Sequence, residues 1–192
     1  AHATLPGLLP GLRLLRPGAD GARYAQVVLA WGRRPSARRA ETWAAERGLP
    51  IVRLEDGLLR SVGLGPEEPP LSIVVDDSGI YYDATSPSRL ERLIGCPETL
   101  ARRERANALI AQWRAARASK YNRAREDARG VRPDDVLVVD QTWGDASIEF
   151  GRASAVDFQR MLESALDEHP QARILLKVHP DVVAGRKRGH FP

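Results

Sequence analysis

Two short apolar runs in the C-terminal part of the chain each stop abruptly at polar residues. Residues 136–139 are all apolar, too few for a helix, and do not alternate with polar positions. They therefore predict a central parallel strand rather than one with a solvated face. Residues 174–176 repeat the pattern. Between the runs, Ser154 and Asp157 indicate a helix start, and the apolar positions that follow share one helical face. The segment is predicted to form a βαβ unit.

The polar residues after these runs are candidates for a binding site, because ligands of open parallel sheets bind beyond the carboxyl ends of the strands. The first run is followed by Asp140, Gln141, Thr142, Asp145 and Ser147, with Gly144 allowing a turn. The second run is followed by Lys177, Val178, His179, Pro180 and Asp181. Two strand ends are thus expected to carry the polar chemistry of this part.

A second strand, helix and strand are predicted in the N-terminal part. Residues 26–31 and 51–54 are apolar runs, and Pro35 and Ser36 open a helix between them that Gly48 and Pro50 end. The buried side of that helix is predicted to hold Ala40, Trp43 and Ala44. The strand at 51–54 stops at Glu55, Asp56 and Gly57, so a strand again leads into acids. Before this unit, residues 12–15 are predicted to form a short strand between loops.

The middle of the chain predicts a hairpin, two helices and a linker. Residues 71–75 read as a strand that turns at Asp76 and Asp77 into a partner at 80–82, and these acids are either turn formers or functional. A short helix is expected from Ser86 and Pro87, and a long one at 98–119. The long helix carries one apolar stripe, made of Ala106, Leu109, Ile110, Trp113 and Ala116. Residues 120–135 lack apolar periodicity and are predicted to link a domain at 1–119 to one beginning at 136–192.

Composition narrows the class of protein without deciding it. The 192 residues, 43% of them hydrophobic, can bury a globular core. No apolar run approaches the roughly 20 residues of a membrane-spanning helix, and no signal peptide opens the chain, which predicts a cytoplasmic or peripheral protein. Cys96 is the only cysteine, so an intrachain disulfide is excluded. The net charge of +4 is compatible with an anionic partner, but the arginines are interspersed with carboxylates, as on a solvated helix face rather than a nucleic-acid surface.

Three groups of residues could carry chemistry. Glu55 or Asp56 could act as a general base if burial raises its pKa. Lys177 and His179 could hold a phosphate by charge-assisted hydrogen bonds. Asp145 could be oriented for reaction by Gln141, Thr142 and Ser147, or it could simply be a helix N-cap. The chain has no glycine-rich phosphate loop, zinc-ligand spacing or Gly-x-Ser-x-Gly motif, which leaves dehydrogenase, P-loop and hydrolase functions without support.

An early E-D-G and a late H-P are similar to the pair found in bacterial sialyltransferases of the GT-B type. The chain resembles more closely the KpsC-type capsule polysaccharide β-Kdo transferases. The resemblance rests on R-L-E-D-G-L-L-R-S-V-G-L-G, P-P-L-S-I-V-V-D-D-S-G-I-Y-Y-D-A, S-K-Y-N, V-V-D-Q-T-W-G-D-A-S and K-V-H-P-D-V-V-A-G. The resemblance covers almost the whole chain. The chain is similar to the N-terminal one of the two transferase modules in these proteins, truncated at both ends. It implies an α/β, GT-B-like fold with an acceptor-side domain at 1–119 and the start of a CMP-sugar-binding domain at 136–192.

The resemblance also implies a reaction. Such enzymes move Kdo from CMP-β-Kdo onto the poly-β-Kdo linker of a lipid acceptor with retention of configuration, at the cytoplasmic side of the inner membrane and in contact with capsule assembly proteins. Asp145 would be the nucleophile, and Glu55 or Asp56 the base. The donor would be bound by Lys177, His179, Pro180, Gln141 and Ser147. No metal, other cofactor or nucleic acid is expected. The alternatives are another CMP-sugar transferase, similar to a sialyltransferase, and a non-catalytic anion-binding domain; whether the fragment alone is active stays open.

Overall fold

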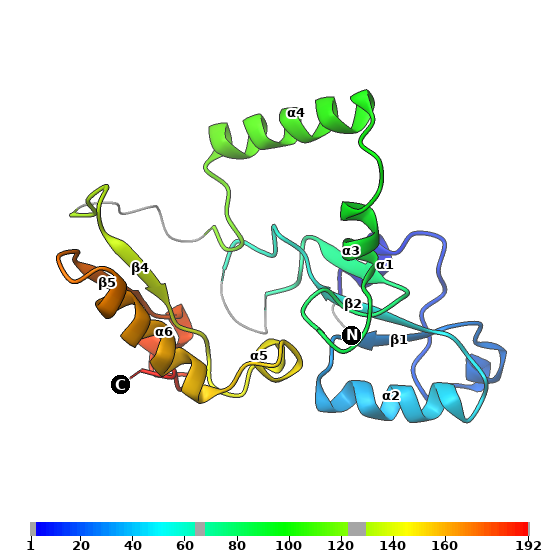
Figure 1. The fold of residues 1–192 in the computed structure, drawn as a ribbon. Helices are drawn as coiled ribbons and strands as arrows, with labels where there is room; N and C mark the ends of the chain where they lie inside the picture. The colour runs from blue at the N-terminus through cyan, green and yellow to red at the C-terminus, as the bar shows by residue number, and fades with distance from the viewer. Residues whose placement is uncertain (1–2, 64–67, 123–129, 192) are drawn as a thin grey trace. The chain divides into compact units, whose positions relative to one another are not determined.

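The computed structural model describes residues 3–63, 68–122 and 130–191 (Figure 1). The chain forms two compact units. Unit 1 comprises Ala1–Tyr81 and Ser86–Arg125, and unit 2 comprises Tyr82–Thr85 and Glu126–Pro192. The predicted boundaries of the linker at 120–135 stay a prediction, and residues 123–129 of it lie outside the described residues.

Unit 1 is built on a three-stranded sheet in the order β1-β2-β3. Strands β1 (Val28–Trp31) and β2 (Ile51–Asp56) are parallel, in a register that pairs Val28 with Ile51, and helix α2 (Pro35–Ala45) connects them. This confirms the predicted strand, helix and strand. Strand β2 continues past the predicted end at Leu54, because β3 (Ile73–Asp76) pairs antiparallel with it as far as Asp56. Glu55 and Asp56 therefore belong to the strand itself.

Helix α2 covers one face of this sheet. It starts with Pro35 in its first turn, and the chain leaves it through Gly48, whose φ of +61° suits a residue without a Cβ. Its buried residues are Ala37 and Ala44, and the predicted Ala40 and Trp43 are half-buried. Arg53, on the same face of β2, donates to the carboxylate of Glu41 on the helix at 2.7 Å. Small side chains and this ion pair set how α2 lies on the sheet.

The other face of the sheet is covered by the N-terminal segment. Leu5 and Leu9, in and just after helix α1 (Leu5–Leu8), form a buried cluster with Leu54. The predicted strand at 12–15 is wrong: these residues form no strand, and a 3₁₀ helix, η1 (Asp20–Tyr24), follows them. The reason is that Leu14 alone contributes to the cluster, while Leu12 and Leu15 are exposed, so the run is not anchored as a strand.

The chain after β3 does not form the predicted hairpin. Asp76 is buried; its Oδ1 accepts from the N–H groups of Ser78 and Gly79, and its Oδ2 accepts from the N–H of Arg89. These bonds turn the chain into helix α3 (Arg89–Ile94), and residues 80–82 form no strand. Turn formation is thus what Asp76 does here. Helix α4 (Leu100–Ala116) lies within the predicted long helix, and its apolar stripe stays exposed.

Unit 2 contains the predicted βαβ unit. Strands β4 (Val136–Val139) and β5 (Ile174–Lys177) are parallel, and helix α6 (Ala155–Glu168) begins with a capping box of Ser154 and Asp157. Short helices α5 (Ala146–Phe150) and α7 (Pro180–Val183) follow the two strands. Phe158 on α6 and Val138 on β4 are buried. The α/β class of the fold is thus confirmed.

The expected burial of β4 on both faces is not found. Leu137 is 57% exposed and Val139 is 45% exposed, and within the described parts of unit 2 the strand pairs with β5 alone. Their side chains point away from the face that holds Val138, because successive residues of a strand face opposite sides. Helix α6 therefore covers only one side of this small sheet. No helix in the described ranges is both long enough and apolar enough to cross a bilayer.

Candidate active site

The carboxyl ends of β4 and β5 lie next to each other, because the strands are parallel and Val139 pairs with Lys177. The N–H of Asp140 donates to the carbonyl of Lys177 at 2.9 Å, so the segments that follow the two strands begin side by side. The predicted donor-side residues therefore gather at one edge of unit 2. They are Gln141, Asp145 and Ser147 after β4, and Lys177, His179 and Pro180 after β5.

Asp145 is exposed and stands at the start of α5. Its Oδ1 accepts from the N–H of Ser147 at 2.9 Å, so it is an N-cap, the alternative that the sequence left open. Gly144 supplies the turn before it with a φ of +75°. The hydroxyl of Ser147 donates to Gln141 Oε1 at 3.3 Å. The N–H of Ser147 thus fixes the orientation of the Asp145 carboxylate, and no hydrogen bond to Asp145 Oδ2 is described.

His179 and Lys177 present an imidazole and an ammonium group at the same edge. His179 is half-buried, and its Nδ1 accepts from the N–H of Asp181 at 3.1 Å. A neutral imidazole that accepts at Nδ1 carries its proton on Nε2, so Nε2–H is the side that can donate to a ligand. Lys177 is exposed and takes part in no described ion pair. Together they can bind an anionic oxygen.

The position of Asp140 after the apolar run makes it a candidate polar residue, but its role in the fold is structural. It is 4% exposed, and its oxygens accept from the N–H groups of Gln141 and His190. A Cβ on Gly189 would lie 2.3 Å from its Oδ2, so only glycine lets the chain approach so closely. Asp140 thereby ties the segment 186–191 to the end of β4.

The segment 186–191 contributes a cation, Arg188, that the pattern of apolar and polar residues in the sequence did not indicate. The N–H of Trp143 donates to the carbonyl of Arg188 at 2.7 Å, and the Arg188 guanidinium lies 4.7 Å from the centre of the Trp143 ring. The His190 ring stacks on Phe158 at 3.9 Å. The sequence signal was only the basic run at 186–188, which lacks apolar periodicity. Arg188 is a further candidate for contact with an anion.

The acids at the end of β2, in unit 1, are engaged differently. Glu55 Oε1 accepts from Trp31 Nε1 and from the N–H of Asp56, each at 3.0 Å. Asp56 Oδ2 accepts from Nε of the buried Arg60 at 3.2 Å. The other oxygen, Asp56 Oδ1, is buried and has no hydrogen-bond partner among the described residues. Most buried carboxylate oxygens in proteins have a hydrogen-bond partner, so Asp56 Oδ1 stands out among the acids of unit 1.

Arg60 is held in place by the loop around it. Its Nη1 donates to the hydroxyl of Ser61, and the N–H groups of both residues donate to the carbonyl of Lys120. Asn122 adds a bond from its side chain to the Ser61 carbonyl at 3.3 Å. The blocks R-S-V-G and S-K-Y-N, far apart in sequence, thus meet beside the acids. The first residues of the predicted linker are attached to unit 1 here.

The described ranges contain no cluster of three or more His, Cys, Asp or Glu side chains arranged to hold a metal ion. The candidate residues at the carboxyl ends of β4 and β5 include side-chain cations, a histidine and the exposed carboxylate of Asp145.

Comparisons with known proteins identify the family of this chain and similar solved structures. Residues 26–129 and 99–191 match the family described as capsule polysaccharide biosynthesis protein. The chain is 46% identical over 199 residues to the capsule polysaccharide modification protein LipA of Neisseria meningitidis serogroup B, covering 97% of this chain and 27% of LipA. It is 37% identical over 171 residues to the lipopolysaccharide-processing protein LpsZ of Rhizobium meliloti, covering 85% of this chain and 39% of LpsZ.

Two solved structures from Thermosulfurimonas dismutans are also similar. The KpsC β-Kdo 2,4 transferase has a TM-score of 0.79 and 47% identity, over 86% of this chain and 53% of that one. The KpsC β-Kdo 2,7 transferase has a TM-score of 0.57 and 31% identity, over 83% of this chain and 49% of that one. The chain therefore spans about half the length of these solved domains and a smaller share of the curated relatives. It belongs to the capsule polysaccharide biosynthesis protein family.

Proposed function

We propose that this chain is part of a glycosyltransferase that moves Kdo from CMP-β-Kdo onto the β-Kdo linker of a lipid acceptor. The observation that carries the proposal is the 47% identity and TM-score of 0.79 to the KpsC β-Kdo 2,4 transferase. The 2,7 transferase is less similar in both measures, which favours a 2,4 linkage. The enzyme would act in the cytoplasm, peripherally at the inner membrane and beside capsule assembly proteins.

The first chemical step would use the residues at the edge of β4 and β5. The carboxylate of Asp145 attacks the anomeric carbon of Kdo, and the bond from that carbon to the phosphate oxygen of CMP breaks. Negative charge builds on the departing phosphate, which Lys177 and the Nε2–H of His179 stabilise. CMP carries a single phosphate, so these side chains can neutralise it without a metal. Gln141, Ser147 and Pro180 would position the donor.

In the second step, the acceptor hydroxyl attacks the same carbon and Asp145 leaves, so configuration is retained overall. The proton of that hydroxyl passes to a carboxylate of the acceptor-side unit. Asp56 is favoured over Glu55, because Asp56 Oδ1 is buried and has no described partner, whereas Glu55 Oε1 accepts from Trp31 and the backbone. A base of this kind would be regenerated when the product leaves.

The test is to incubate the full-length enzyme with CMP-Kdo and no acceptor, and to map added mass by peptide mass spectrometry. One Kdo is expected on the peptide that contains Asp145. Asp145→Asn should form no adduct and lose roughly 10⁴-fold or more in turnover while staying folded, since asparagine is an equally good N-cap. Glu149→Gln, an exposed change one turn away, should keep both adduct and turnover.

Other results would count against parts of the proposal. Near-normal turnover in Asp145→Asn, or an adduct on Glu55 or Asp56, would refute the assigned nucleophile. Transfer from CMP-sialic acid in place of CMP-Kdo would point to the sialyltransferase-like alternative. Binding of anions unaffected by loss of Asp145 and His179, without any transfer, would point to a non-catalytic anion-binding domain.

A further inference from the structure

Main-chain hydrogen bonds fix residue 188 beside the end of β4. The carbonyl of Arg188 accepts from the N–H of Trp143 at 2.7 Å. Two residues later, the N–H of His190 donates to both carboxylate oxygens of the buried Asp140, at 3.2 Å each. Neither bond involves the side chain of Arg188. The position of this residue is therefore expected to survive a change of its side chain.

The Arg188 side chain lies over an aromatic ring. Its guanidinium carbon is 4.7 Å from the centre of the Trp143 ring, and Trp143 is 50% exposed. That ring is also in tilted contact with the ring of His190, at 5.0 Å between their centres. An arginine over an aromatic face is held by cation–π attraction, and its N–H groups stay available as donors. No ion pair or side-chain hydrogen bond in the described ranges uses the N–H groups of Arg188.

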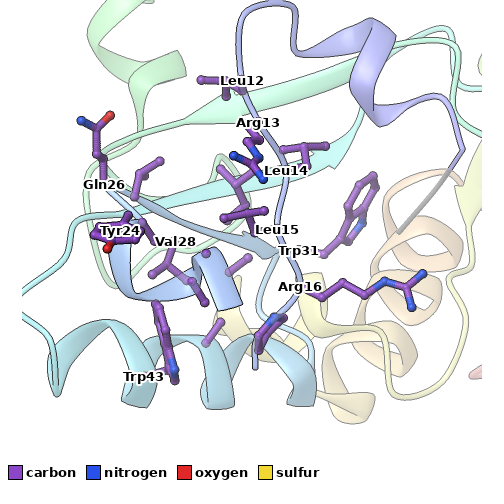
Figure 2. Close-up of a pocket in the computed structure, with 18 of the residues that line it drawn as sticks. Leu12, Arg13, Leu14, Leu15, Arg16, Tyr24, Gln26, Val28, Trp31 and Trp43 are labelled. Carbon is purple, nitrogen blue, oxygen red and sulfur yellow. The ribbon is translucent and has the colours of Figure 1, made fainter. Parts of the chain in front are cut away.

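The arginines that line a pocket of unit 1 lack this support. The pocket has a volume of about 940 Å³ and is lined by Arg13, Arg16 and Arg39 among apolar side chains; Figure 2 shows the first two on the N-terminal segment. No hydrogen bond, ion pair or ring contact described for the chain involves these three guanidinium groups. Ordering a long side chain on binding costs conformational entropy, and a side chain that is already held avoids part of this cost. Arg188 is therefore better prepared to bind a small anion.

The donor of the proposed reaction carries two anionic groups on one carbon. The anomeric carbon of Kdo bears the oxygen that links it to the phosphate of CMP, and it also bears the carboxylate of the sugar. In the proposed reaction, Lys177 and His179 bind the phosphate. A second group is then needed for the carboxylate. It must lie close to the nucleophile, because the carboxylate is one bond away from the carbon that is attacked.

Arg188 has the position and the shape for this role. Trp143 lies in the turn before Asp145, and the N–H of Asp145 donates to the carbonyl of Thr142 at 3.2 Å. The guanidinium thus lies over a residue of the turn that leads to the proposed nucleophile. A guanidinium also presents two parallel N–H donors that match the two oxygens of a carboxylate, whereas a lysine ammonium acts as a point charge.

We propose that Arg188, supported by Trp143, binds the carboxylate of the donor sugar. This inference rests on the proposed function and deepens it by naming a residue that determines donor specificity. The enzyme selects a sugar that carries a carboxylate at its anomeric carbon, since a neutral sugar offers no partner to the guanidinium. Lys177 and His179 bind the phosphate of any CMP-sugar, and Arg188 distinguishes among the sugars.

Steady-state kinetics of the full-length enzyme test the assignment. Kdo transfer from CMP-Kdo to a β-Kdo acceptor gives KM and kcat, with the linkages formed resolved by NMR, and inhibition by CMP reports binding of the phosphate alone. Arg188→Met should lower kcat/KM by about 10- to 100-fold. The loss should lie mainly in KM, because the carboxylate is charged in the ground state and in the transition state alike. The inhibition constant of CMP should not change, since CMP has no carboxylate.

Two further variants sharpen the result. Lys187→Met removes the neighbouring exposed cation, which has no described contact with Trp143, and it should leave both constants unchanged. Arg188→Lys keeps the charge but loses the paired donors, so its kcat/KM should lie between those of Arg188→Met and the natural enzyme. Equal melting temperatures of all four proteins would show that the fold is intact.

The other outcomes would overturn the assignment. Unchanged kcat/KM in Arg188→Met would do so, and so would an equal loss in Lys187→Met. Equally weakened CMP and CMP-Kdo in Arg188→Met would place Arg188 at the phosphate instead. If the natural enzyme transfers no Kdo from CMP-Kdo, the proposed function fails and this inference fails with it. Transfer by the natural enzyme together with unaltered kinetics in Arg188→Met would refute the inference alone.

Discussion

The carboxyl end of β2 and the joined ends of β4 and β5 follow the same sequence pattern, an apolar strand that runs into charged residues. Their environments differ. At β2, the acids are half-buried and held by Trp31 and Arg60. At β4 and β5, Asp145 and Lys177 are exposed, and the bond described for the Asp145 carboxylate is its N-cap bond to Ser147. The comparison separates carboxylates that partners within the fold hold in place from charged groups that lie exposed to solvent.

The difference has a chemical meaning in the proposed reaction. A nucleophile and phosphate-binding groups must meet a large, charged donor, and exposed side chains on short turns allow this. A base that receives one proton from a hydroxyl needs little space, but it benefits from a fixed position. The fixed acids of unit 1 and the open edge of unit 2 therefore fit the acceptor-side and donor-side roles respectively.

The largest expected effect on stability comes from breaking the ion pair between Arg60 and Asp56 at the end of β2. Arg60→Met removes the cation from Asp56 and leaves a carboxylate that is 16% exposed without its partner. Loss of one partner of a buried pair costs about 3–5 kcal/mol, so the free energy of unfolding should fall by about that amount. Urea unfolding of the full-length protein, followed by the fluorescence of its tryptophans, would measure it.

The matched control is Arg89→Met, which removes one cation from the exposed carboxylate of Asp77. That carboxylate also pairs with Arg92, and the Arg89 hydrogen bond lowers the pKa of Asp77. Exposed ion pairs contribute little to stability, so the urea concentration at the unfolding midpoint should barely change. Equal losses in the two variants would show that burial of the β2 acids does not distinguish the two regions.

A smaller effect, on catalysis rather than folding, is expected at the carboxyl ends of β4 and β5. His179→Ala removes the Nε2–H proposed to bind the leaving phosphate. A hydrogen bond to a charged group contributes about 1.5–3 kcal/mol, so kcat/KM for CMP-Kdo should fall roughly 10- to 100-fold with the melting temperature little changed. His169→Ala, at the exposed end of α6, should leave both unchanged. Unaltered kinetics in His179→Ala would show that His179 does not bind the donor.

The smallest effect is a pH-dependent one at the opposite ends of β4 and β5. Hydrogen bonds from Arg173, and then from the N–H of Arg132, lower the pKa of Asp135 from 3.8 to about 2. A carboxylate whose pKa is lowered by folding stabilises the fold above its ordinary pKa, and this contribution is lost as the pH falls from 3.8 toward 2. Asp135→Asn should therefore melt lower than the natural protein at pH 7, and the difference should shrink toward pH 2.

Melting curves between pH 7 and pH 2 would check this, with Asp167→Asn on the exposed surface of α6 as the control. The control should show the same small difference at every pH. A difference for Asp135→Asn that does not change with pH would mean that the pair with Arg173 does not hold the two strand starts together.

Local patterns were sufficient to predict most of the regular elements. The apolar runs at 26–31, 51–54, 136–139 and 174–176 correspond to β1, β2, β4 and β5. The capping box of Ser154 and Asp157 marks the start of α6. These features depend on side-chain periodicity and on bonds between residues close in sequence, which a sequence displays directly. The motif blocks likewise indicate the family by their residues alone.

What the sequence could not determine depends on contacts between distant residues. The run at 12–15 has a strand-like composition, but only Leu14 is anchored in the core. Asp140 and Asp145 both follow β4, yet only Asp140 is buried, because the chain near Gly189 returns to its side chain. The sequence by itself determined which residue types follow each strand. The tertiary structure decided which of them are neutralised by the fold and which stay exposed, because burial and partners come from segments far apart in the chain.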